Sequence, residues 1–139
     1  DAVIAFFPSL SNKFVVCDRA VRCGISMLTI IKNGLNPILN QYDYPDLSAK
    51  IGIDEGENII VQYGNDEKSP LDILSYCMSV SAKMTSLTKS NNITIGDDVY
   101  VRLHPELRQK FDRVNYSARE WNYVSKRTGE LYKLYTLKQ

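Results

Sequence analysis

The sequence predicts an α+β domain with a mixed sheet and with helices packed on one face of it. Three observations predict this class: runs of β-branched and aromatic residues, other stretches in which apolar residues lie three and four apart, and the order in which the two patterns alternate. The chain has 139 residues, the length of one domain. We expect the order strand, helix, hairpin, strand, helix, strand, helix and hairpin.

The first part of the chain is expected to form a strand and a long helix. Residues 2–7 are apolar and rich in β-branched and aromatic side chains, which is typical of a buried strand. Over residues 14–31, apolar side chains recur at helical spacing, which predicts an amphipathic helix. Gly34 is expected to stop this helix, and Asn36 with Pro37 to begin a short second one.

The middle part is expected to form a hairpin, a short strand and a second helix. Apolar and polar residues alternate over residues 48–63, which predicts a hairpin. Residues 71–74 form the next expected strand. Ser75 is a suitable N-cap for a helix over residues 76–89, one face of which is apolar.

The last part contains two expected helices and three expected strands. They are a strand over 93–95, a helical segment over 97–103, a short helix over 105–111, and a closing hairpin with strands over 114–124 and 131–137. The hairpin is expected to turn at Thr128 and Gly129.

Composition and charge exclude several classes of function. Hydrophobic residues make up 44% of the chain and charged residues 24%, as in soluble globular domains. The 17 Lys and Arg residues are balanced by 16 Asp and Glu, so no general attraction to nucleic acid is expected. No run of about 20 apolar residues exists, so we expect no membrane contact by this domain.

Cysteine and histidine narrow the chemistry. Cys17, Cys23 and Cys77 form no CxxC pair, so we expect reduced thiols in a cytoplasmic domain. The only histidine, His104, precedes Pro105 at an expected loop, so histidine-based nucleophilic catalysis is not expected. A metal ion would then be held by carboxylates, which favours magnesium or manganese.

Three stretches carry a resemblance to a known family. They are residues 50–57 (KIGIDEGE), 71–86 (LDILSYCMSVSAKMTS) and 93–100 (ITIGDDVY). In order, spacing and context they resemble the catalytic domain of class III adenylate and guanylate cyclases. Asp1 and the apolar residues after it look like the family's Gly-Asp step and the strand that follows it. The resemblance implies a ferredoxin-like, palm-type sheet in a catalytic domain that spans residues 1–139 and lacks its first strand and helix, so we expect a longer protein.

The resemblance also implies a reaction. The ribose 3′-oxygen of a nucleoside triphosphate attacks the α-phosphate and expels pyrophosphate, assisted by two divalent ions, Mg²⁺ or Mn²⁺, that two aspartates hold. Asp1 stands at the position of the second metal-binding aspartate. The first aspartate, and the lysine that reads the base in adenine-specific members, would precede residue 1.

Asp72 falls at the position that hydrogen-bonds the purine in this family. A carboxylate accepts from the amino group of adenine and repels O6 of guanine, so ATP is preferred to GTP as the expected substrate. The alternative is a solvated aspartate at the start of a short strand.

Ser79 and Lys83 fall where the family usually has an asparagine that orients the ribose and an arginine that stabilises the transition state. Four residues apart on a helix, they share a face. Lysine keeps the charge without the planar fork of arginine, and serine has one donor where the amide has two, so any activity is expected to be slow. The alternative is a solvated polar helix face.

The closing hairpin often carries a phosphate-binding lysine in this family. Thr128 occupies roughly that place, and the adjacent Lys126 and Arg127 are expected to take over the role; the alternative is a basic surface turn. The acidic stretch 54–57 looks like paired carboxylates for acid-base work. The resemblance places it in the hairpin that shapes the dimer and the cleft, so no chemistry is assigned to it.

Three interpretations of the function follow. In the first, the chain is an active cyclase of intracellular signalling that makes 3′,5′-cyclic AMP as a head-to-tail homodimer. Its metal aspartates come from one subunit, and Asp72, Ser79 and Lys83 come from the other. The second is a degenerate cyclase-homology domain that binds nucleotide or dimerises without turnover, and the substitutions at positions 79 and 83 favour it. The third, a generic ferredoxin-like binding module, explains none of the spacing.

Overall fold

The structure is a computed structural model, and it describes residues 2–9 and 12–139. Four strands form a mixed sheet in the order β1-β4-β6-β5: β1 (Lys50–Ile53), β4 (Asn92–Gly96), β5 (Phe111–Val114) and β6 (Leu134–Leu137). β1 and β4 are parallel, with Ile51 beside Ile93, and the other pairings are antiparallel. The predicted α+β class with a mixed sheet is therefore confirmed.

A long helix covers one face of the sheet. α1 (Lys13–Ile30) begins at Asn12, whose side chain accepts a hydrogen bond from the backbone of the first turn. Val21 of this helix is fully buried against Ile93 of β4. Gly24 allows the close approach, because a methyl group there would lie 3.2 Å from Cδ1 of Ile93.

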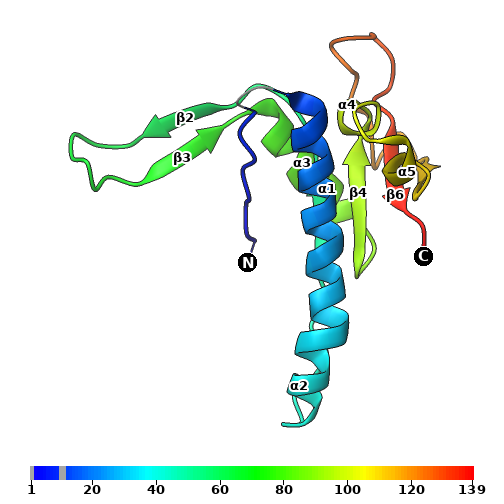
Figure 1. Cartoon of the computed structure of the whole chain (residues 1–139). Coiled ribbons are helices and arrows are strands. Elements are labelled where there is room, and N and C mark those ends of the chain that lie inside the picture. The colour runs from blue at the N-terminus through cyan, green and yellow to red at the C-terminus, as the bar shows by residue number, and fades with distance from the viewer. Residues whose placement is uncertain (1, 10–11) are drawn as a thin grey trace.

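The helix does not stop at Gly34. It continues through a π-helical turn (Ile31–Leu35) into α2 (Asn36–Asn40) and runs beyond the sheet (Figure 1). The expectation of a stop at Gly34 was therefore wrong. A glycine costs only about 1 kcal/mol inside a helix, and here the backbone hydrogen bonds continue past it in the wider π pattern.

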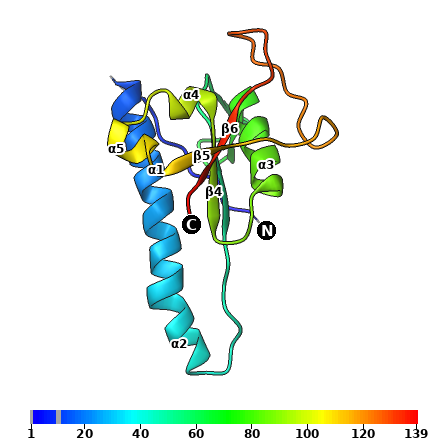
Figure 2. The same ribbon diagram turned by 90° about the vertical axis from the view of Figure 1, so that its right-hand side faces the viewer.

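The opposite face of the sheet is covered by α3 (Tyr76–Leu87). The side chain of Ser75 accepts a 2.9 Å hydrogen bond from the N–H of Met78, so the predicted N-cap is confirmed. The buried residues on this face are Val80, Met84, Trp121, Tyr132 and Leu134. Figure 2 shows α1 and α3 on opposite sides of β4. The helices thus lie on both faces of the sheet and not on one.

A separate two-stranded ribbon projects from the sheet and its helices (Figure 1). It consists of β2 (Ile59–Gln62) and β3 (Leu71–Leu74), with Ile60 opposite Ile73. The predicted hairpin over residues 48–63 was wrong, because β1 pairs with β4 and β2 pairs with β3. Alternation indicates a strand but does not say which strand lies beside it.

The last part of the chain follows the predicted order. Two short helices join β4 to β5: α4 (Asp97–Tyr100) and α5 (Pro105–Arg108). β5 and β6 form the closing antiparallel pair, with Phe111 beside Leu137. The first strand of this hairpin therefore begins at Phe111, earlier than predicted. The connection to β6 is irregular and contains one isolated bridge, between Val124 and Leu131.

The opening segment is not the buried strand that was predicted over residues 2–7. Residues 2–9 form neither helix nor strand, and Val3 is 93% exposed. A strand needs a neighbour for its backbone N–H and C=O groups, and no described strand pairs with this segment.

Among the helices that the structure describes, none has the length and apolar character needed to span a bilayer.

Candidate functional site

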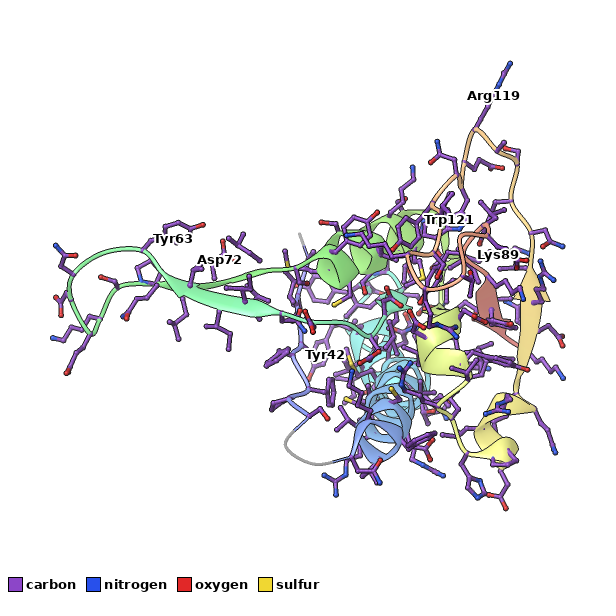
Figure 3. All side chains as sticks on the ribbon, turned by 90° about the horizontal axis from the view of Figure 1, so that it is seen from above. Tyr42, Tyr63, Asp72, Lys89, Arg119 and Trp121 are labelled. Carbon is purple, nitrogen blue, oxygen red and sulfur yellow. The ribbon has the colours of Figure 1, made fainter. Side chains whose placement is uncertain are left out.

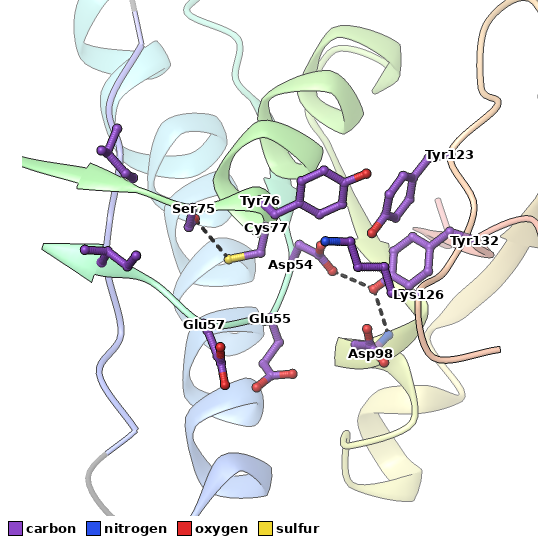
Figure 4. A pocket seen from close by; sticks show the side chains of 13 residues that line it. Asp54, Glu55, Glu57, Ser75, Tyr76, Cys77, Asp98, Tyr123, Lys126 and Tyr132 are labelled. Carbon is purple, nitrogen blue, oxygen red and sulfur yellow. Dashed lines mark hydrogen bonds between the residues drawn. The ribbon is translucent and has the colours of Figure 1, made fainter. Parts of the chain in front are cut away.

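A pocket of about 380 Å³ lies where the end of β1, the start of α3 and the turn at residues 125–130 meet (Figure 4). Its lining contains four carboxylates, one ammonium group and three phenols: Asp54, Glu55, Glu57, Asp98, Lys126, Tyr76, Tyr123 and Tyr132. So many titratable groups in one hollow make this pocket the candidate functional site.

Asp54 is the carboxyl group at the end of β1. The hydroxyl of Tyr132 donates a 2.7 Å hydrogen bond to its Oδ1. Gly96 ends the neighbouring strand β4 beside this pair; a methyl group there would collide with Oδ1 and lie 2.6 Å from the Tyr132 hydroxyl. Burial raises the pKa of Asp54 to about 7. The hydrogen bond from Tyr132 favours the ionised form and so lowers the pKa, but the effect of burial is larger. Asp54 therefore exchanges its proton near neutral pH.

Two of the other carboxylates already have cationic partners. Glu55 lies 2.6 Å from Nζ of Lys13 and 3.3 Å from Nη1 of Arg102. Asp98 lies 3.2 Å from Nε of Arg127. These ion pairs offset much of the negative charge that the pocket wall would otherwise carry.

The ammonium group of Lys126 lies over an aromatic ring. Its Nζ is 4.9 Å from the centroid of the Tyr76 ring, within the range of a cation–π contact. Tyr123 packs against Tyr76 with ring centroids 5.1 Å apart. No ion pair joins Lys126 to a carboxylate in the part of the chain that the structure describes, so its charge is available to an anionic ligand.

Solved structures that match this arrangement of elements include nucleotide cyclases. The guanylyl cyclase Cya2 matches with a TM-score of 0.69 and 15% identity, over 94% of this chain and 62% of that one. The adenylyl cyclase CyaB from P. aeruginosa matches with a TM-score of 0.69 and 16% identity, over 95% of this chain and 63% of that one. The guanylate cyclase domain of RhGC from Catenaria anguillulae, solved in complex with GTP, matches with a TM-score of 0.60 and 17% identity, over 88% of this chain and 59% of that one.

The chain has the fold of a class III adenylyl/guanylyl cyclase catalytic domain. It spans about three fifths of the length of the cyclases that it matches. No protein-family model matches the sequence, and no curated protein matches it. In these comparisons, the likeness to known cyclases is therefore one of fold.

In this cyclase fold, Ser79 and Lys83 share an exposed face of α3, as the sequence predicts. Ser79 Oγ donates a 3.4 Å hydrogen bond to the carbonyl of Ser75. Hydrogen bonds from Ser117, assisted by the charge of Lys83, lower the pKa of Glu120. Neither Ser79 nor Lys83 lines the pocket.

Asp72 lies on the projecting ribbon, away from the pocket (Figure 3). It is exposed, stands opposite Val61, and accepts a 2.8 Å hydrogen bond from the N–H of Ile73. Within one chain, the structure does not bring Asp72 to the pocket that Lys126 lines.

The two basic residues of the closing turn have different surroundings. Lys126 lines the pocket, whereas Arg127 binds the carboxylates of Asp97, at 3.3 Å, and Asp98, at 3.2 Å. Arg127 thus ties the turn to the start of α4, and only Lys126 reaches the pocket. Thr128 does not line it.

The metal-binding role predicted for Asp1 falls on a residue outside the described ones. Within residues 2–9 and 12–139, no three His, Cys, Asp or Glu side chains converge to form a metal site. The described residues alone therefore do not fit the two-ion arrangement that the sequence resemblance implies.

Sequence reasoning missed the pair at the centre of the pocket. Asp54 was assigned no chemistry, and Tyr132, Tyr76 and Tyr123 were not identified as site residues. Asp54 and Tyr132 are 78 positions apart, and no spacing rule joins a strand end to a hairpin at that separation. The one available signal was the acidic stretch that follows a predicted strand.

Proposed function

We propose that this chain is the greater part of a class III cyclase catalytic domain that converts ATP to 3′,5′-cyclic AMP and pyrophosphate in the cytoplasm. The observation that supports this proposal is the likeness in fold, over 94% of the chain, to a guanylyl cyclase and, over 95%, to an adenylyl cyclase. The RhGC domain holds GTP, and a related rhodopsin-guanylyl cyclase with converted specificity holds ATPαS. A nucleoside triphosphate is therefore the ligand that we assign to this chain.

The proposed reaction forms the bond between the ribose 3′-oxygen and the α-phosphorus while the bond to pyrophosphate breaks, and the 3′-hydroxyl loses its proton. Two divalent ions, Mg²⁺ or Mn²⁺, would supply Lewis-acid stabilisation, and Asp1 and an aspartate that precedes it would hold them. The described residues contribute the other groups. Lys83 and Lys126 stabilise the negative charge of the phosphates, and Ser79 orients the ribose.

We propose that the substrate is ATP and not GTP because of Asp72. Its carboxylate is exposed and its Oδ1 accepts one backbone hydrogen bond, which leaves lone pairs for the amino group of adenine. Guanine presents an acceptor, O6, at the equivalent place, and two acceptors repel each other.

We further propose that the active form is a head-to-tail homodimer. The ribbon β2–β3 supports this, since two strands alone are only marginally stable in water. Apolar side chains on both of its faces are exposed in the single chain: Ile59, Ile60, Leu71 and Leu74. A second copy that covers the ribbon would bring Asp72 to a site completed by metal-binding aspartates of the partner subunit.

A strand and a helix that precede residue 1 belong to the same proposal. β1 is an edge strand of the sheet, so its outer edge has no strand neighbour among the residues that the structure describes. An uncovered edge offers unpaired backbone groups to a further strand. We propose that the preceding segment supplies this strand together with the first metal-binding aspartate.

The substitutions on α3 favour a second candidate, a cyclase-homology domain that binds nucleotide or dimerises without turnover. Ser79 and Lys83 replace the amide and the guanidinium that the family resemblance leads us to expect. Losing one well-placed donor to developing negative charge typically costs about 10² to 10³ in rate. Two such losses could leave binding without measurable turnover.

Turnover of ATP and GTP with manganese by the polypeptide extended to its upstream strand tests these proposals. We expect cyclic AMP to form, Asp72→Asn to lower the preference for ATP, and the matched change Asp66→Asn, in the ribbon loop, to leave it unchanged. ATP binding without cyclic product would establish the degenerate domain. Failure to bind either nucleotide would contradict the active cyclase and the nucleotide-binding form of the second candidate, and would leave only a domain that dimerises.

A further inference from the structure

One hydroxyl group joins three separate elements beside the pocket. Tyr132, which is 4% exposed, donates a 2.7 Å hydrogen bond to Oδ1 of Asp54 at the end of β1. The same hydroxyl accepts a 3.0 Å hydrogen bond from the backbone N–H of Asp98 in α4. The two dashed lines that meet at this oxygen in Figure 4 are these bonds. The ring of Tyr132 is therefore held at its tip from two sides.

The backbone of Tyr132 holds the base of the turn that carries Lys126. Its N–H donates a 2.8 Å hydrogen bond to the carbonyl of Tyr123, and its carbonyl accepts one of 2.8 Å from the indole of Trp121. Two further backbone bonds, both 2.8 Å and both involving Ser125, close the turn itself. Any displacement of Tyr132 is thus transmitted to the base of this turn.

The tip of the turn is held by Arg127, through Asp97 and Asp98 of α4. Lys126 directly precedes Arg127, and its side chain projects into the pocket over Tyr76. Arg127 at the tip of the turn and the Tyr132 hydroxyl at its base therefore both contact α4. The Tyr132 hydroxyl also connects α4 to Asp54. The position of Lys126 therefore depends on the network around Asp54.

The groups facing Asp54 decide what its charge does. They come from its own strand end, from α4, from the start of α3 and from the turn: Glu55, Glu57, Asp98, Cys77, Tyr76, Tyr123, Tyr132 and Lys126. Glu55 and Asp98 have guanidinium or ammonium partners outside the pocket lining. Lys126 is the one cation among the described lining residues, and it forms no ion pair with a described carboxylate. An ionised Asp54 would be a second pocket carboxylate, besides Glu57, without an ion-pair partner among the described residues, and it would attract Lys126.

We propose that Asp54 and Tyr132 are positioning residues for Lys126. While Asp54 carries its proton, the network holds Lys126 over the Tyr76 ring with its charge available to a polyphosphate. Once Asp54 loses that proton, the carboxylate competes with the polyphosphate for Lys126. The proposal rests on the proposed function only in assigning a polyphosphate to Lys126.

Binding of inorganic tripolyphosphate to the 139-residue protein tests the competition. Affinity is measured by calorimetry at about pH 6 and about pH 8, on either side of the Asp54 titration. Relative to Asp54→Asn, which cannot ionise, the wild-type protein is expected to lose affinity several-fold at the higher pH. Tyr132→Phe keeps the ring but loses the hydroxyl, and it is expected to weaken tripolyphosphate binding at both pH values. The matched controls Asp18→Asn and Tyr116→Phe should behave as wild type, and an equal pH response in wild type and Asp54→Asn overturns the proposal.

NMR separates this proposal from the proposed function. In a pH titration of the ligand-free protein, the side-chain resonances of Lys126 are expected to shift with the same midpoint as the titration of the Asp54 carboxyl. This shift should vanish in Asp54→Asn. If tripolyphosphate does not bind but the coupled titration is seen, the assigned ligand is wrong and the positioning role stands. If Lys126 does not follow Asp54, the positioning role is wrong whatever binds.

Discussion

Arg127 is bound to Asp98: its Nε lies 3.2 Å from Oδ1 of that carboxylate, and its Nη2 lies 3.3 Å from Oδ2 of the neighbouring Asp97. From the sequence, Arg127 and Lys126 are equivalent candidates for a phosphate. The structure distinguishes them, because one cation is neutralised by two carboxylates and the other lies over an aromatic ring in the pocket.

Lys126→Ala is expected to weaken ATP binding more than Arg127→Ala. The side chain of Arg127 is 55% exposed, so its ion pairs should contribute at most about 1 kcal/mol to stability. Dissociation constants from calorimetry and thermal midpoints for both variants check this, with the exposed Arg119→Ala as control. Loss of ATP binding in Arg127→Ala, with an unchanged thermal midpoint, would make Arg127 the phosphate ligand instead.

The stability of the protein is expected to fall as pH rises from about 4 to about 7. In this range an unfolded Asp54 ionises at its ordinary pKa of 3.8, while the folded one keeps its proton until about pH 7. The folded state then binds more protons, so the free energy of unfolding decreases by at most about 1.4 kcal/mol per pH unit. Urea unfolding at several pH values should show this slope in wild type and in Asp18→Asn, and a shallower one in Asp54→Asn. Identical slopes in all three would mean that Asp54 is not protonated in the folded protein.

Gly96→Ala is expected to destabilise the protein by about 1 to 3 kcal/mol. The added methyl group would collide with Oδ1 of Asp54 and lie 2.6 Å from the Tyr132 hydroxyl, so the hydrogen-bonded pair would have to separate. The matched change Gly34→Ala meets only Cγ2 of Ile30, at 3.9 Å, and should stabilise the helix by up to about 1 kcal/mol. Denaturant unfolding of both variants gives the comparison, and a Gly96→Ala protein as stable as wild type would show that the pair is loosely packed.

Lys83→Arg is expected to raise the turnover of the complete domain, and Lys83→Ala to lower it by about 10² or more. A guanidinium offers a planar pair of donors to phosphate oxygens, which the ammonium lacks. Initial rates of cyclic AMP formation measure the effect, with the exposed Lys89→Arg, just beyond α3, as control. If both Lys83 variants match wild type, Lys83 does not touch the transition state.

Local patterns predicted most elements of the fold correctly. Ser75 was predicted as the N-cap of a helix, and its side chain caps α3. The strand predicted over residues 93–95 is the centre of β4. Both features depend on neighbours within a few positions, which the sequence displays directly. The pairing of β1 with β4 depends on residues about 40 positions apart, and there the prediction failed.

The candidate site divides in the same way. The four-residue spacing predicted that Ser79 and Lys83 share one helix face, because helical periodicity is local. Neither this spacing nor the family resemblance identified Asp54 and Tyr132, whose contact requires the end of β1 to lie beside the closing hairpin. Their role near the pocket depends on burial, and burial depends on every element packed around them.

The sequence by itself determined the α+β class, the capped helix α3 and the likeness to nucleotide cyclases, because each is written in short-range periodicity or in ordered stretches of residues. The tertiary structure alone decided which strands pair, which basic residue of the closing turn reaches the pocket, and that the pKa of Asp54 lies near 7. Strand pairing, charge neutralisation and desolvation depend on groups that are distant along the chain and meet only after folding.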